Sequence, residues 1–100
     1  MSKRIIAAID EIPEGTSKIV TIQGKDIAVF NIDGEFYAIS NTCPHRGGPL
    51  GEGCVSENVV TCPLHGWEFD VTTGKSPTMP NVCIQTYDVE TRGDDIIVTI

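Results

Sequence analysis

Short apolar stretches separated by polar turns run through the whole chain. The stretches are rich in Ile, Val and Thr, and none approaches the length of a membrane span. Short length and branched side chains are typical of β-strands, because these side chains pack well on a pleated surface. We therefore predict strands over 3–9, 18–22, 27–32, 36–39, 58–62, 66–71, 84–90 and 96–100.

The turns between these stretches favour hairpins. Asp33-Gly34 stands between two predicted strands, and Asp-Gly flanked by strand residues is a strong hairpin signal because both turn positions adopt positive φ. The chain holds 13 Ile, 9 Val and 10 Thr but only 2 Leu, which favours strands over helices. With 100 residues, we expect one all-β domain over 1–100, a small antiparallel β-sandwich or partly open barrel.

The charge balance limits the classes of partner. Fourteen acidic residues stand against seven basic ones, for a net charge of −7. Nucleic acids and anionic membranes bind clustered Lys and Arg, so we expect neither as a partner. The apolar run 5–9 is shorter than a secretory signal core and has no cleavage signal. A cytoplasmic protein is the default expectation.

Two segments interrupt the strand pattern, and each carries a cysteine and a histidine. Residues 41–53 hold four Gly and two Pro, too many breakers for a regular element. The second segment is the tight connection around 62–65. Irregular loops of the first kind in a compact domain are usually functional. Four cysteines in a cytoplasmic domain indicate metal or redox chemistry more than a disulfide framework.

The cysteines and histidines have the spacing of metal ligands. Cys43 and His45 form a C-x-H pair, and after sixteen intervening residues Cys62 and His65 form a C-x2-H pair. Zinc accepts two Cys and two His, but its finger spacing groups Cys with Cys and His with His. Because each loop here offers one of each, a two-iron cluster explains the mixture better. One iron takes both thiolates and the other both imidazoles.

The residues around these ligands resemble the two cluster-binding boxes of the Rieske family. The boxes read Cys43-Pro44-His45-Arg46-Gly47-Gly48-Pro49-Leu50 and Cys62-Pro63-Leu64-His65-Gly66-Trp67-Glu68-Phe69-Asp70, and the resemblance covers essentially the whole chain. It implies the Rieske fold, with a cluster-binding part of two loops at about 41–80. It also implies one [2Fe–2S] cluster, with Cys43 and Cys62 on the buried iron and His45 and His65 on the outer iron.

Departures from the respiratory members of the family indicate a subgroup. Gly48 and Leu64 occupy the positions of the two cysteines that form a disulfide in respiratory proteins. Trp67 and Phe69 replace the serine and tyrosine whose hydroxyls donate to sulfur there. Fewer donors to sulfur stabilise the added electron less, so we predict a reduction potential of roughly −150 mV. The chain therefore resembles the small Rieske ferredoxins of aromatic-ring-hydroxylating dioxygenase systems.

This resemblance implies an electron carrier rather than an enzyme, with no catalytic residue of its own. The implied partners are a flavin-dependent NAD(P)H reductase, which donates electrons, and a terminal oxygenase, which receives them. Two alternatives remain open at this point. The chain could be the Rieske-like small subunit of an assimilatory nitrite reductase, or a zinc-binding interaction module without a redox role.

The residues outside the ligand set complete the expectations. Cys54 and Cys83 have no metal spacing and are expected to be small buried hydrophobes. Residues 41–80 carry a net charge of −2, which leaves −5 elsewhere. We therefore expect an acidic body to steer encounters and a nearly neutral tip to make the contact. A collar that keeps water off the sulfurs is expected from Pro49, Leu50, Leu64, Trp67, Pro77, Met79 and Pro80.

Overall fold

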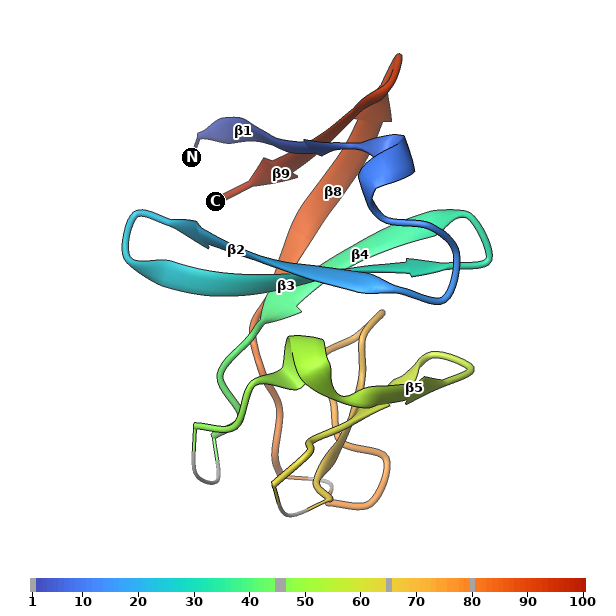
Figure 1. Cartoon of the computed structure of the whole chain (residues 1–100). Helices are drawn as coiled ribbons and strands as arrows, with labels where there is room; N and C mark the ends of the chain where they lie inside the picture. Colours follow the sequence, from blue (N-terminus) through green and yellow to red (C-terminus); the bar gives the residue numbers. More distant parts are fainter. Residues whose placement is uncertain (1, 45–46, 65, 80) are drawn as a thin grey trace.

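The protein folds into two antiparallel sheets, one large and one small. The structure is a computed structural model that describes residues 2–44, 47–64, 66–79 and 81–100. The larger sheet has six strands in the order β1-β9-β8-β4-β3-β2, and the smaller has three in the order β5-β6-β7. In Figure 1 the smaller sheet and its loops lie below the larger sheet. No helix of the described chain is long and apolar enough to cross a membrane.

The strands have the following bounds in chain order. They are β1 (Lys3–Ala8), β2 (Ser17–Ile22), β3 (Lys25–Ile32), β4 (Glu35–Ser40), β5 (Cys54–Ser56), β6 (Val59–Thr61), β7 (Glu68–Asp70), β8 (Thr86–Arg92) and β9 (Asp95–Thr99). Two single-turn 3-10 helices lie in the connections between strands: η1 (Ile9–Glu11) lies between β1 and β2, and η2 (Leu50–Glu52) lies between β4 and β5. All pairings are antiparallel, and all eight predicted strands correspond to observed ones. The all-β fold class is confirmed, and β5 was not predicted.

The predicted hairpin at Asp33-Gly34 is present. Asp33 has φ of 55° and Gly34 has φ of 87°, and Ile32 pairs with Glu35 across the turn. This is the left-handed conformation that Asp-Gly adopts at low cost. The hairpin joins β3 and β4, which lie side by side in the larger sheet.

Strand β3 separates two hydrophobic cores. On one face, Ile27 and Val29 pack with β1 and β9 residues such as Ile96. On the other face, Ala28 and Phe30 pack with residues of the smaller sheet and its loops. All four side chains are almost fully buried. A strand covered on both faces loses the alternation of apolar and polar residues, which explains why the pattern over 27–32 alternates only loosely.

Candidate metal centre

The two cysteine loops lie at the end of the molecule away from β1 and β9, next to the smaller sheet (Figure 1). The first loop follows β4 and leads into η2. The second joins β6 to β7 and is the turn of that hairpin. Both loops therefore begin where a strand ends.

The backbones of the two loops make the same pair of hydrogen bonds. The Cys43 N–H donates to the Gly48 carbonyl at 2.9 Å, and the Cys62 N–H donates to the Trp67 carbonyl at 2.7 Å. In return, the cysteine carbonyls accept the N–H groups of Gly47 at 2.8 Å and Gly66 at 3.1 Å. Each loop is thus closed by bonds from its cysteine to the residues four and five positions later.

Glycine is required at three positions of these loops for two different reasons. Gly47 and Gly66 occupy the same loop position with φ of 71° and 75°, a conformation that costs other residues about 1–2 kcal/mol. Among the described residues, the nearest group to a Cβ at Gly47 is the Thr42 Cγ2 at 3.9 Å, and none lies within 4 Å of a Cβ at Gly66. At Gly48 the reason is close approach, because a Cβ there would lie 2.7 Å from the Cys62 Sγ. The second cysteine therefore points at the backbone of the first loop.

Both candidate cysteine ligands lie in a dry environment. Cys43 is 1% exposed and Cys62 is 3% exposed. They belong to one buried cluster with apolar side chains from both sheets and the loops, among them Phe30, Leu50, Val60, Phe69 and Val71. A site that buries two thiolates needs a compensating positive charge. A diferric core supplies it, so the donor set and its burial fit a two-iron cluster.

The predicted ligands His45 and His65 lie outside the described residues, as does Pro80 of the expected collar. Their described neighbours Pro44, Gly47, Leu64 and Gly66 are exposed. Each loop thus passes from a buried cysteine to an exposed segment within a few residues.

The other collar residues divide into two groups. Leu50 is fully buried and belongs to the core rather than to a rim, whereas Trp67 is half-buried and packs against the same core. Leu64 is 54% exposed, yet its Cγ would lie 3.1 Å from a Cβ at Gly48. The apolar side chain of Leu64 therefore lies against the neighbouring loop.

The Pro-containing loop at 76–82, between β7 and β8, is fixed by a buried serine. Ser76 is 6% exposed, and its Oγ accepts the N–H groups of Thr78 at 3.4 Å and Met79 at 3.1 Å. The Ser76 N–H in turn donates to the Val82 carbonyl at 3.1 Å. These bonds hold the half-buried Met79 and the exposed Pro77 in one arrangement beside the core.

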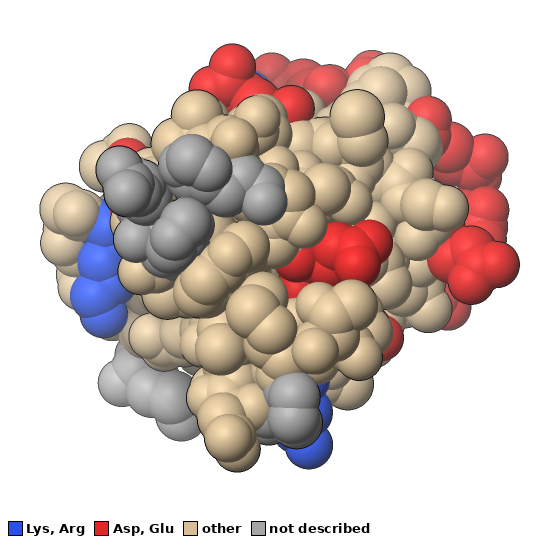
Figure 2. All heavy atoms as spheres, turned by 90° about the horizontal axis from the view of Figure 1, so that it is seen from below, with Lys and Arg blue, Asp and Glu red and all other residues tan. Residues whose placement is uncertain are grey.

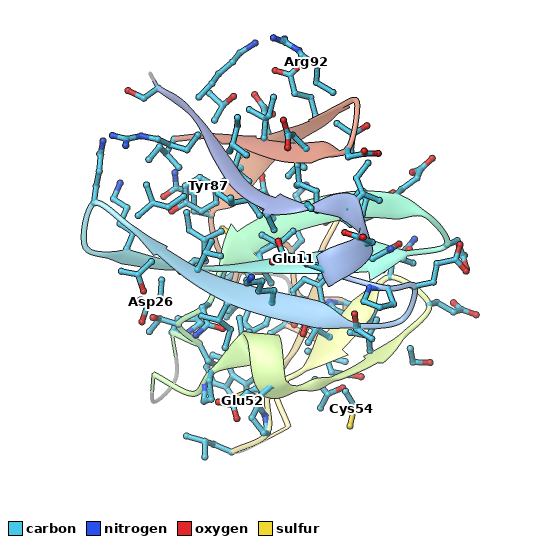
Figure 3. All side chains as sticks on the ribbon, turned by 45° about the horizontal axis from the view of Figure 1, so that its top comes forward. Glu11, Asp26, Glu52, Cys54, Tyr87 and Arg92 are labelled. Atoms are coloured by element: carbon cyan, nitrogen blue, oxygen red, sulfur yellow. The ribbon has the colours of Figure 1, made fainter. Side chains whose placement is uncertain are left out.

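The expectation that Cys54 and Cys83 are buried is wrong. Both are exposed free thiols. Cys54 begins β5, an edge strand whose three residues are all exposed, and its sulfur points outward in Figure 3. Cys83 forms an isolated bridge with Lys75 beside the Pro-containing loop. Edge strands and loop bridges leave side chains in water regardless of their type.

The shifted pKa values of the described groups belong to surface contacts. The Ala8 N–H donates to Glu11 at 2.7 Å, and together with Lys18 it holds the pKa of the Glu11 carboxyl below its usual range. Lys3 does the same for the pKa of Glu90 through a 2.8 Å ion pair. Tyr37 packs on the cysteine core, and its hydrogen bond to Glu35 raises the pKa of its hydroxyl.

Comparison with known proteins decides the family. The profile of the Rieske [2Fe-2S] domain matches residues 2–88. The chain belongs to the Rieske family. The cofactor of such a Rieske domain is a [2Fe–2S] cluster with two Cys and two His ligands, as the spacing of the two boxes predicts.

Relatives of this Rieske protein carry the name ferredoxin. The ferredoxin component of the naphthalene 1,2-dioxygenase system of Pseudomonas aeruginosa is 36% identical over 94 residues, which cover 93% of this chain and 90% of the relative. Among solved structures, the ferredoxin of carbazole 1,9a-dioxygenase from Nocardioides aromaticivorans superposes with a TM-score of 0.90 at 31% identity, covering 98% of this chain and 97% of that one.

A further solved structure places such a ferredoxin in a complex. It is described as reduced oxygenase with oxidised ferredoxin in carbazole 1,9a-dioxygenase, and it matches with a TM-score of 0.88 at 30% identity. The match covers 96% of this chain and 91% of that chain. In that system a ferredoxin similar to this Rieske protein docks on its oxygenase.

Proposed function

We propose that this chain is the ferredoxin of an aromatic-ring-hydroxylating dioxygenase system. It carries single electrons from a flavin-dependent NAD(P)H reductase to a terminal oxygenase, and it performs no chemistry on an organic substrate. The proposal treats 1–100 as a single Rieske domain in the cytoplasm, with the cluster-binding part at about 41–80. It rests on the relatives that bear this name and on two matched loops that bury their cysteines side by side.

The proposed ligands are Cys43, His45, Cys62 and His65. When bound, the cluster supplies a one-electron redox change. The chain's own residues do the rest. Phe69, Val60 and Leu50 exclude water from the two sulfurs, and Gly48 gives Cys62 room to approach the first loop. A fixed, dry site lowers the reorganisation energy of each electron transfer.

The surface around the loops favours transient docking. Figure 2 views the molecule from the end that carries both loops. Residues other than Lys, Arg, Asp and Glu cover most of this face. Carboxylates lie toward its right and upper margins and in one patch near its middle, and basic side chains lie at its left and lower margins. Exposed Leu64 lies in the second loop, and exposed Glu52 and Glu57 lie in η2 and in the β5–β6 turn. We propose that the acidic residues orient a basic partner and that the nearly neutral end, which carries both loops, makes the contact.

The nitrite reductase alternative has weaker support. A putative small subunit of that enzyme superposes with a TM-score of 0.90, but at 21% identity, which indicates a shared fold alone. Ferredoxin components at 36–40% identity favour the dioxygenase system instead.

Reduction by a partner tests the function directly. Purified protein should contain two iron atoms per chain and no zinc. It should bleach when mixed with NADH and a catalytic amount of a dioxygenase ferredoxin reductase, and regain its colour when the matching oxygenase and substrate are added. A protein with a proven cluster that no such reductase reduces would contradict the ferredoxin role. A colourless protein with zinc would support the interaction module instead.

A further inference from the structure

A buried asparagine joins the first cysteine loop to the larger sheet. Asn41 follows β4 directly and is 7% exposed. Its N–H donates to the Asp26 carbonyl of β3 at 2.9 Å, and its carbonyl accepts the Leu50 N–H at 2.8 Å. Its side-chain Oδ1 accepts the Gly51 N–H at 2.7 Å. One residue thus holds β3 on one side and both residues 50 and 51 on the other.

The Gly51 peptide is held from the opposite side as well. The Ser17 hydroxyl of β2 donates to the Gly51 carbonyl. A Cβ on Gly51 would collide with Ile19 of β2 and would lie 3.0 Å from the Asn41 Oδ1. Only glycine fits in this gap, so η2 sits directly on β2. Figure 3 labels Asp26 at the start of β3 and Glu52 in η2, the two elements that the hydrogen bonds of Asn41 connect.

The hydrogen bonds of Asn41 to Leu50 and Gly51 hold the start and the end of the first loop together. Beyond Asn41 the chain forms the Thr42–Pro49 bridge, followed by the hydrogen bond between the Cys43 N–H and the Gly48 carbonyl. With the bond between Asn41 and Leu50, these pairings form a short three-step ladder that has Asn41 and Gly51 at its base. The second loop needs no such base, because β6 and β7 pair directly beneath it through Thr61 and Glu68.

We propose that Asn41 is the positioning residue that sets the first loop, and hence Cys43, against Cys62. This role rests on the proposed ligation of the cluster by both loops. Without the Oδ1 acceptor, the part-buried Gly51 N–H loses its partner, and the base of the ladder opens. The loop then moves relative to the second loop, which changes the geometry at the iron atoms and exposes the cluster to water.

A second buried asparagine provides a matched control. Asn31 is 5% exposed, and its Oδ1 also accepts a glycine N–H, that of Gly34 at 2.9 Å. Its Nδ2 donates to the Ile12 carbonyl at 2.8 Å. Asn31 therefore resembles Asn41 in burial and bonding, but it fixes the β3–β4 turn and the segment after η1 rather than a cysteine loop.

The experiment compares Asn41→Ala with Asn31→Ala in the cluster-loaded protein. Both variants should lower the melting temperature. Only Asn41→Ala should shift the g values of the reduced cluster's EPR spectrum and speed release of iron to a ferrous chelator, by about tenfold. Peptides covering 47–53 should exchange amide hydrogens faster in Asn41→Ala alone.

Ser17→Ala provides a second, milder variant if Asn41→Ala does not fold. It removes the bond on the other side of the same peptide and should change the same three signals in the same direction, by a smaller amount. The inference is overturned if the Asn41 or Ser17 variant keeps the wild-type g values and iron release, or if Asn31→Ala changes them equally. A wild-type protein that carries no Rieske signal would instead overturn the proposed function.

Discussion

The two cysteine loops have the same backbone bonds but different foundations. The second loop is the turn of a hairpin, and the pairing of β6 with β7 continues without interruption up to Cys62. The first loop has no hairpin of its own and closes on Asn41, a single bridge and a 3-10 turn held by β2. Similar cysteine sites therefore arise from local strand pairing in one loop and from long-range packing in the other.

The two loops depend on contacts that form at different stages of folding. The second loop depends on residues close in sequence, so its geometry forms together with β6 and β7. The first depends on contacts between Gly51 and Ser17, which are 34 positions apart. We therefore expect the second loop to form before the first as the chain folds.

The largest effect is expected from Gly48→Ala, which breaks the contact between the loops. The new Cβ would stand 2.7 Å from the Cys62 Sγ and 3.1 Å from the Leu64 Cγ. Overpacking of this kind costs about 1–3 kcal/mol, and in a liganded site the sulfur cannot rotate away. We expect the iron content to fall well below two atoms per chain, as measured by metal analysis. Iron content at the wild-type level would show that the loops have room to separate.

A smaller, equal effect is expected from Gly47→Ala and Gly66→Ala. Both glycines have positive φ, at 71° and 75°, without crowding, so each substitution should cost about 1 kcal/mol of conformational strain. Urea denaturation of the two apoproteins measures this cost. Equal losses of unfolding free energy support matched backbones, and a loss confined to one loop would show that the match is not maintained in solution.

The next effect concerns association rather than folding. If the acidic body steers partners toward the nearly neutral end, raising the salt concentration from 0.05 to 0.5 M should slow association with a reductase or oxygenase severalfold. Electron transfer within the preformed complex should change much less. Stopped-flow mixing at several protein concentrations separates the two rates. An association rate that does not vary with salt would exclude steering by the net charge of −7.

The smallest effect lies far from both loops. The pKa of the Glu11 carboxyl is held below its usual range by the Ala8 N–H and by Lys18, so ionised Glu11 stabilises the fold above its unfolded pKa. That contribution is lost as the pH falls through the folded pKa. The Glu11→Gln variant should therefore melt slightly below wild type at pH 7, and the gap should close as the pH falls through the folded pKa of Glu11. A gap that is constant over this range would assign it to packing.

The sequence was sufficient for the strands and for the family, because both depend on local signals. Branched residues predict β3 and β8, and Asp33-Gly34 predicts the β3–β4 turn. Strand β5 was missed because three residues, Cys54–Ser56, are too few to show alternation. The burial of Cys54 was wrong because residue type does not reveal that its strand lies at an edge.

The support of the site was not predictable from sequence. A lone asparagine before a ligand box carries no signal, and the role of Asn41 emerges only when β2, β3 and η2 are brought together. The reasons for the loop glycines also emerge only from the structure, because Gly47 and Gly66 have positive φ, whereas Gly48 is needed for the close approach of Cys62.

A redox titration followed by EPR tests the central proposal most directly. With Cys43, His45, Cys62 and His65 as ligands, and with no hydroxyl donors at Trp67 and Phe69, the reduced protein should give a rhombic signal of low average g. The midpoint should lie near −150 mV, roughly the low end of the Rieske range. A midpoint above about +100 mV would contradict the low-potential assignment. The absence of any such signal from protein with a full complement of iron would contradict the cluster itself.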